Sequence, residues 1–221
     1  MNLVTVSNEH TIDTDLLAKD GWILDVGCRF FDLSAEFARL GCQVLALDPS
    51  LSVVDRKLTN VKFLRSALVG DKSVRSALFC DSNDAAHLVH GHRNPTHGVP
   101  QYTVPCVTVE DLLCAYLLNR FEVVKLDCEG AEFDILSRWP GPVATQITCA
   151  FHDFVNPAWC RDAYPALLNH LSQWYTVVQH QSYVRHGHPT PCFWDSLFVL
   201  KPGLGQKASL PLDLLPDTSK K

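Results

Sequence analysis

The sequence has little of what would place it in a specialised class of protein. No apolar run among its 221 residues approaches the ~20 residues that a membrane-spanning helix needs. The opening segment, MNLVTVSNEHTIDTD, has neither the basic region nor the apolar core of a secretory signal. The formal net charge of −5 leaves no excess of basic residues to neutralise phosphates. We therefore expect no membrane span, no signal peptide and no nucleic-acid partner.

Paired cysteines are missing as well. The nine cysteines are scattered along the chain without any C-x-x-C motif, and Cys128 and Cys149 lie inside apolar, strand-like runs. An odd, scattered set of this kind is typical of reduced thiols and not of a disulfide framework or a zinc site. The pattern predicts a cytoplasmic protein.

Glycine is scarce in the one segment where it is expected. Residues 23–34, ILDVGCRFFDLS, show an apolar strand, a turn and the start of an amphipathic helix, which is the outline of a cofactor loop. Only Gly27 is present, and Arg29 and Phe31 stand where further glycines are expected. A dinucleotide loop needs its second glycine so that the backbone can approach the pyrophosphate. The Arg29 side chain therefore disfavours NAD, whereas a cofactor without a pyrophosphate is compatible with this loop.

Apolar, β-branched runs alternate with segments of helical periodicity along most of the chain. This alternation predicts an α/β protein with a Rossmann-like, doubly wound and mostly parallel sheet that closes in a C-terminal antiparallel hairpin. We expect one domain over residues 1–201 and a mobile tail over 202–221. The expected parallel strands are 22–26, 43–48, 61–65, 121–127 and 144–152, and the expected helices are 33–40, 51–58, 109–119, 131–139 and 158–173.

Two connecting segments carry further signals. Residues 67–80, ALVGDKSVRSALFC, contain a Gly-Asp turn between alternating residues, which predicts a hairpin. Residues 83–101 contain four histidines together with prolines and glycines, which is typical of a long surface loop, either solvated or covering the acceptor site. None of these histidines pairs with a cysteine at zinc-finger spacing, so we assign them no metal.

Ligands of open α/β sheets bind beyond the carboxyl ends of the strands. Asp48 lies at such an end, 21 residues after Gly27. An acid in this place accepts hydrogen bonds from ribose hydroxyls, and the alternative is a merely solvated aspartate. The residues that follow the expected strands are 25–31, 48–50, 66–67, 127–132 and 152–154.

The segment VVKLDCEGAEFDIL, residues 123–136, carries the most specific pattern. An apolar strand runs into K-L-D-C-E-G-A-E and then into a helix, with VTVEDLL upstream. Together with LDVG, Asp48-Pro49 and SALVGDKS, this order of motifs resembles the FkbM family of S-adenosylmethionine-dependent methyltransferases over roughly residues 20–155.

The resemblance implies a class I methyltransferase with a seven-stranded sheet and S-adenosylmethionine as cofactor. Asp25 and Gly27 then approach the methionine part of the cofactor, Asp48 the ribose and Ser66 the adenine, with Asp127 close to the reacting centre. The cofactor-binding positions implied in this way are Asp25, Gly27, Cys28, Arg29, Asp48, Pro49, Ser66, Ala67 and Asp127.

Methylation of a hydroxyl requires a group that takes up the hydroxyl proton. The candidates are Asp127, Glu129 and His152, although a histidine at a strand end is equally often structural. A divalent metal held by the carboxylates at 127, 129 and 132 is an alternative that we do not favour, because Glu132 falls on a helix and D-x-E is a weak ligand set. We therefore assign no metal ligand from the sequence.

The expected function is O-methylation of a small molecule or of a sugar or glycan, which would be a carbohydrate modification. The alternative is a catalytically impaired relative with a binding or assembly role. Arg29 and Phe31 depart from the loop of the family, and Ala150 stands where many relatives carry an acid. The sequence determines neither the acceptor nor the oligomeric state.

Overall fold

The computed structural model describes residues 1–6, 10–50, 58–82, 86–89, 97–152, 157–183 and 193–204. The expected helix at 51–58, apart from its last residue, and residues 205–221 of the expected tail lie outside this part of the chain. Among the described residues, no helix combines the length and the apolar character needed to cross a membrane.

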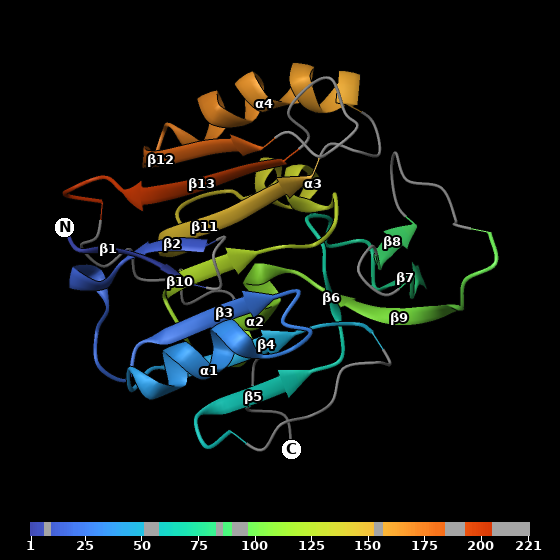
Figure 1. Cartoon of the computed structure of the whole chain (residues 1–221), viewed down its shortest axis with the longest axis horizontal. Coiled ribbons are helices and arrows are strands. Elements are labelled where there is room, and N and C mark those ends of the chain that lie inside the picture. Colours follow the sequence, from blue (N-terminus) through green and yellow to red (C-terminus); the bar gives the residue numbers. More distant parts are fainter. Residues whose placement is uncertain are drawn as a thin grey trace, which may run out of the picture.

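A seven-stranded sheet forms the centre of the molecule, in the order β12-β13-β11-β10-β3-β4-β5 (Figure 1). The five strands from β11 to β5 are parallel, and β13 lies antiparallel between β11 and β12. This confirms the expected Rossmann-like sheet and its closing antiparallel pair. The strands are β3 (Trp22–Val26), β4 (Gln43–Leu47), β5 (Val61–Leu64), β10 (Phe121–Leu126), β11 (Ala144–His152), β12 (Tyr175–Tyr183) and β13 (Phe193–Leu200).

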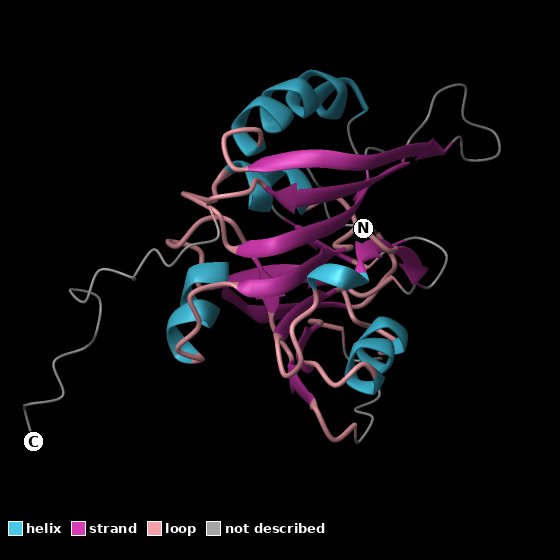
Figure 2. Ribbon diagram, turned by 90° about the vertical axis from the view of Figure 1, so that its left-hand side faces the viewer, coloured by secondary structure: helices cyan, strands magenta, loops and turns pink. Residues whose placement is uncertain are grey.

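The sheet is apolar on both faces because helices lie on both sides of it (Figure 2). Ile23 packs with Leu33 and Phe37 of one helix, whereas the next residue, Leu24, belongs to the core on the opposite face. That alternation places α1 on one face and the other three helices on the opposite face. The helices are α1 (Asp32–Arg39), α2 (Val109–Ala115), α3 (Glu132–Ser137) and α4 (Pro157–Leu171).

An N-terminal pair of strands, which the sequence analysis did not predict, covers part of the α1 face. Strands β1 (Leu3–Val6) and β2 (His10–Asp13) are antiparallel, and a short 3-10 helix (Thr14–Leu16) follows them. The Gln146 side chain of β11 accepts a hydrogen bond from the Asp13 N–H (2.7 Å) and donates one to the Asp13 carbonyl (2.9 Å). Two buried hydrogen bonds to one side chain hold β2 against the central sheet, and thereby place His10 near the strand ends.

A second, smaller sheet has the order β6-β9-β7-β8 and lies beside the carboxyl ends of the central strands (Figure 1). The hairpin expected over 67–80 is wrong, because β6 and β7 do not pair with each other. Each pairs with β9, one in parallel and one antiparallel. The loop expected over 83–101 is partly wrong too, because it contains β8, which pairs with β7. The four strands are β6 (Ala67–Leu68), β7 (Ser76–Cys80), β8 (His87–Val89) and β9 (Gln101–Val107).

Candidate functional site

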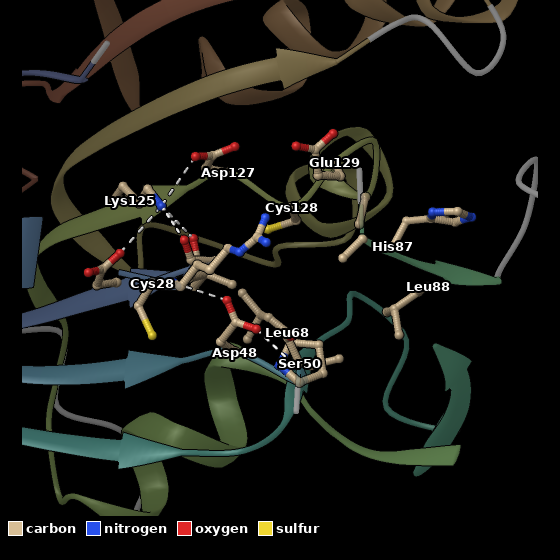
Figure 3. Close-up of a pocket in the computed structure, with 18 of the residues that line it drawn as sticks. Cys28, Asp48, Ser50, Leu68, His87, Leu88, Lys125, Asp127, Cys128 and Glu129 are labelled. Carbon is tan, nitrogen blue, oxygen red and sulfur yellow. Dashed lines mark hydrogen bonds and ion pairs between the residues drawn. The ribbon is translucent and has the colours of Figure 1, made fainter. Parts of the chain in front are cut away.

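A pocket of about 390 Å³ opens where β3, β4 and β10 end, and the smaller sheet forms its far wall (Figure 3). All nine positions that the sequence analysis assigned to cofactor binding line it. They come from four separate segments of the chain and converge on one cavity. The lining includes Asp25, Gly27, Cys28, Arg29, Asp48, Pro49, Ser66, Ala67 and Asp127.

Gly27 occupies the tightest point of the pocket wall. Its φ of +75° lies in the left-handed region, and a Cβ at this position would come within 1.9 Å of the Asp127 carbonyl oxygen. Any residue with a side chain would therefore meet backbone as well as adopt a strained conformation. The glycine lets the loop after β3 pass directly against the end of β10.

The Phe31 side chain does not enter the pocket. Phe31 has a φ of +59°, is 1% exposed and packs edge-on against Phe63, 5.4 Å between ring centroids. Cys28 and Ala46 complete this small core. The aromatic residue therefore stabilises the turn from the inside. Its neighbours line the pocket instead, where the Arg29 guanidinium lies 5.0 Å from the centroid of the exposed Phe30 ring.

Ala150, which stands where many relatives carry an acid, lies opposite an acid of the adjacent strand. Ala150 of β11 pairs in register with Asp195 of β13, and both residues are buried. Directly opposed residues of an antiparallel pair point to the same face of the sheet. An acid is therefore present on this face of the sheet, carried by the adjacent strand.

Asp48 is held in place by main-chain donors from two loops. Its Oδ2 accepts the Arg29 N–H (3.1 Å) and its Oδ1 accepts the Ser50 N–H (2.8 Å). Burial raises the pKa of Asp48 above its ordinary value, although these two hydrogen bonds act in the opposite direction. A carboxylate offers about four lone-pair positions, so two remain for hydroxyl donors from the pocket.

Lys125 ties the loop after β3 to two acids. Its Nζ donates to the carbonyl oxygens of Val26 (3.0 Å) and Gly27 (2.8 Å), and lies 3.5 Å from Oδ1 of Asp25 and 3.5 Å from Oδ2 of Asp127 (Figure 3). Burial alone would lower the pKa of Lys125, but the two carboxylates raise it above its ordinary value. Lys125 is therefore a fixed positive charge beneath the pocket floor.

The three residues proposed for catalysis lie together: Asp127 and Glu129 line the pocket, and the buried His152 lies behind them, outside its lining. One side-chain oxygen or nitrogen from each of Asp127, Glu129 and His152 lies within 4.8 Å of the other two. The Nε2 of His152 is 3.7 Å from Oδ1 of Asp127. Glu129 has a φ of +54°, a strained backbone conformation for a glutamate, and such strain is concentrated at functional sites.

Glu132 fixes the orientation of His152, and it lies on a helix as expected. Glu132 begins α3, yet its side chain is fully buried and turns back to Nδ1 of His152 at 3.0 Å. The same carboxylate accepts the N–H groups of Cys128 (2.7 Å) and Gly130 (3.0 Å). Because an ionised carboxylate only accepts, Nδ1 of His152 carries the proton and Nε2 faces Asp127.

These contacts set the protonation states of His152 and Asp127. Burial would lower the pKa of His152, but the Glu132 carboxylate and then Asp127 raise it to about 9. Burial would raise the pKa of Asp127, but Lys125 foremost, with His10 and His152, holds it well below its ordinary range. At neutral pH, His152 is therefore an imidazolium beside an ionised Asp127.

Sequence reasoning missed His10 and the apolar wall of the pocket. The buried Nε2 of His10 lies 3.8 Å from Oδ2 of Asp127. Two short alternating runs, LVTV and HTID, were the available signal for the strands that carry it. His87, from the segment expected to be a loop, is buried on β8 and lines the pocket. The apolar lining consists mainly of Ala67, Leu68, Phe79, Ala86 and Leu88.

A family model described as the methyltransferase FkbM domain matches residues 25–167, well over half of the chain. No curated protein matches the sequence. Three of the solved structures to which this chain is similar all have identities below 15% and TM-scores below 0.5. A TehB-like SAM-dependent methyltransferase from Corynebacterium glutamicum is 12% identical, with a TM-score of 0.43 over 85% of this chain and 84% of that chain. An rRNA methylase from Streptococcus thermophilus is 13% identical, with a TM-score of 0.46 over 85% and 91%. A fibrillarin pre-rRNA processing protein from Methanococcus jannaschii is 9% identical, with a TM-score of 0.47 over 90% and 70%.

Proposed function

The chain belongs to the FkbM family of methyltransferases, and we propose that it methylates a hydroxyl oxygen of a small molecule, a sugar or a glycan. Family membership makes it an enzyme that uses S-adenosylmethionine; the oxygen acceptor is our proposal. The observation that supports it is the cluster of Asp127, Glu129 and His152, of which Asp127 and Glu129 line the pocket. A hydroxyl donates a hydrogen bond and must lose its proton on methylation, and this cluster offers acceptors for both.

The pocket suits S-adenosylmethionine along its whole length. Asp25, Asp127 and Glu129 place negative charge at one end, which fits a ligand with a sulfonium and an ammonium group. Asp48 in the middle retains acceptor capacity for ribose hydroxyls. The apolar wall formed by Leu68, Phe79 and their neighbours fits a flat adenine ring.

The bound cofactor supplies a methyl group on a sulfonium, which leaves as a neutral thioether when a nucleophile takes the methyl. The protein has to hold an acceptor oxygen in line with that methyl group, and orientation alone supplies ~7–11 kcal/mol of a barrier in ideal cases. Asp127 is 26% exposed and ionised, so it can receive a hydrogen bond from the hydroxyl. The hydroxyl becomes strongly acidic as its new O–C bond forms, so even a carboxylate of lowered pKa can take the proton at that stage.

His152 has a different role from that of Asp127. With its pKa near 9 it is protonated at neutral pH, so it cannot act as the base in that state. Its positive charge and that of Lys125 keep Asp127 ionised and oriented. We assign proton acceptance to Asp127 and Glu129, and positioning to His152.

The catalytically impaired alternative rested on Arg29 and Phe31 in the loop and on Ala150 in β11. Phe31 lies inside the protein core and leaves the pocket open, which supports an active enzyme. We further propose that residues 1–201 act as one methyltransferase domain. We also propose a cytoplasmic location, in line with the eight described cysteines, none of which is in a disulfide.

The test is methyl transfer from the labelled cofactor to a panel of acceptors. Sugars, oligosaccharides, polyols and phenols form one arm, and primary amines, RNA and DNA form the other. We expect label only in the hydroxylated arm, in a methyl ether that resists alkaline hydrolysis. Label confined to the amine or nucleic-acid arm would contradict the proposal of an oxygen acceptor.

A further inference from the structure

Asp127, Glu129 and His152 mark what we call the acceptor end of the pocket. These side chains, and the Glu132 carboxylate behind His152, are of the kinds found in metal sites. We propose that Asp127, Glu129 and His152 bind a divalent first-row transition-metal ion of the Mn²⁺, Fe²⁺ or Zn²⁺ kind. The inference deepens the proposed function, because the ion would lie where the acceptor hydroxyl binds. As a Lewis acid it would lower the pKa of that hydroxyl and orient its oxygen.

The spacing of the three side chains is close to that of a coordination sphere. Their ligand atoms lie within 4.8 Å of one another. Two ligands on opposite sides of an ion, each about 2.1 Å from it, are about 4.2 Å apart. Small side-chain rotations therefore suffice to close the site. Asp127 remains partly exposed, which leaves coordination positions for water or an acceptor oxygen.

The two oxygens of Asp127 face different partners. Oδ2 lies 3.5 Å from Lys125 Nζ, whereas Oδ1 lies toward His152, 3.7 Å from its Nε2. An ion between Oδ1 and Nε2 would thus leave the ion pair with Lys125 intact. It would also fill a 3.7 Å gap that is too long for a hydrogen bond.

The contact behind His152 is the one that metal-binding histidines use. Nδ1 of His152 donates to the fully buried Glu132 carboxylate, which two main-chain N–H groups hold in place. A carboxylate in this position fixes the ring orientation and makes the other ring nitrogen a better ligand. Nε2, the ligand atom, is the nitrogen that faces Asp127.

A second observation, independent of the three ligands, points to a missing partner at the same place. His10 is nine-tenths buried or more, and its Nε2 has no hydrogen-bond partner among the described residues. That nitrogen lies 3.8 Å from Asp127 Oδ2. Buried polar atoms are rarely left unpaired, and an ion or its bound water would supply the partner. His10 comes from β2, a strand that is not part of the central sheet.

The ligand set also restricts the kind of ion. Two carboxylates with one imidazole suit Mn²⁺, Fe²⁺ and Zn²⁺, whereas Mg²⁺ and Ca²⁺ prefer oxygen ligands alone. From the sequence, D-x-E was a weak ligand set, and a metal was not favoured. Our proposal rests on what the structure adds to that pair: His152 as a third ligand, with Glu132 behind it.

The experiment starts from protein stripped with EDTA and desalted, and titrates it with MnCl₂, ZnCl₂ and MgCl₂ by calorimetry. We expect one Mn²⁺ or Zn²⁺ per chain, with Mg²⁺ at least about 10-fold weaker. Glu129→Gln and His152→Gln should abolish this binding, and Glu132→Gln should weaken it about 10–100-fold. Glu110→Gln and His97→Gln, outside the pocket, are the matched controls and should bind as the wild type does.

One measurement does not depend on variants that fold. Pulsed electron paramagnetic resonance of Mn²⁺-loaded wild type should show a directly coordinated imidazole nitrogen. Absence of that signal, absence of stoichiometric Mn²⁺ or Zn²⁺ binding, or undiminished binding by Glu129→Gln and His152→Gln would each overturn the metal site. Methyl transfer by EDTA-treated enzyme at the untreated rate would remove the catalytic role of the ion and leave the proposed function standing. Stoichiometric Mn²⁺ binding without any methyl transfer would leave the ion and remove the function.

Discussion

The two ends of the pocket are built in different ways. At the cofactor end, main-chain groups dominate: Gly27 passes against the end of β10, and Asp48 is held by two N–H groups. At the acceptor end, side chains from three distant segments meet: Asp127 lies 3.8 Å from His10 and 3.7 Å from His152.

The difference teaches which property each end controls. A site made of backbone and one carboxylate selects and holds a ligand, and it tolerates changes of charge elsewhere. A site made of interacting ionisable groups sets protonation states, and each group depends on the others. Binding and methyl transfer should therefore be separable by mutation, and the following changes test this, from the largest expected effect to the smallest.

Gly27→Ala should have the largest effect, because it removes the close approach that joins the two ends. The new Cβ would overlap the Asp127 carbonyl, so we expect a loss on the order of 4 kcal/mol or more in the free energy of unfolding. Gly41→Ala is the matched control, since Gly41 has a φ of +85° with open space around it. It should lose only about 1–2 kcal/mol in urea unfolding. Equal losses for both variants would show that backbone conformation, not the contact with β10, is what matters at Gly27.

Asp127→Asn should act mainly on methyl transfer. We expect kcat to fall about 10²–10⁴-fold, because the hydroxyl loses its charged acceptor. The affinity for S-adenosylhomocysteine, measured by calorimetry, should fall much less, by about 5-fold, because one negative charge near the ammonium group is lost while Asp25, Asp48 and the loop after β3 are unaltered. Unchanged turnover would remove Asp127 from catalysis.

His152 should make the stability of the acceptor end depend on pH. Its pKa is raised from 6.5 to about 9 on folding, so its stabilising contribution is complete below pH 6.5 and is lost as the pH rises through about 9. A shift of this size corresponds to roughly 3 kcal/mol. In chelator-treated protein, urea unfolding should show a larger deficit for His152→Gln at about pH 6 than at about pH 10.

The exposed His97 provides the comparison for that series. His97→Gln should match the wild type at both pH values. A His152→Gln deficit that stays constant with pH would mean that the ring contributes packing but no charge interaction with Glu132.

Asp48→Asn should have the smallest of these effects, and on cofactor binding alone. An amide offers one oxygen to two main-chain N–H groups and loses the charge that receives ribose hydroxyls. We expect the KM for S-adenosylmethionine to rise about 10–100-fold, with kcat within a few-fold of wild type. A fall in kcat with unchanged KM would place Asp48 in the chemistry and contradict the separation of the two ends.

The cofactor end could be predicted from the sequence because its geometry is local. A strand, a turn and a helix follow one another in the chain, and the distance from Gly27 to Asp48 is set by one βαβ unit. The direction of Phe31 could not be predicted, because it depends on the φ of +59° in the turn and on a core with Phe63.

The acceptor end could be predicted only in part. KLDCEGAE identified Asp127 and Glu129, since they lie in one contiguous motif. His10 could not be placed, because it is far from Asp127 in the sequence. Its contact with Asp127 depends on how β2 packs against β11. The pairing of β6 and β7 with β9 was missed for the same reason: alternation predicts strands, but long-range packing chooses their partners.

A calorimetric titration of the wild type with S-adenosylhomocysteine, beside a titration with NAD⁺, tests the central claim most directly. The pocket predicts one S-adenosylhomocysteine per chain in the micromolar range, and NAD⁺ at least about 100-fold weaker because the Arg29 side chain stands where a pyrophosphate needs bare backbone. Absence of S-adenosylhomocysteine binding at millimolar concentration, or tighter binding of NAD⁺, would contradict the account.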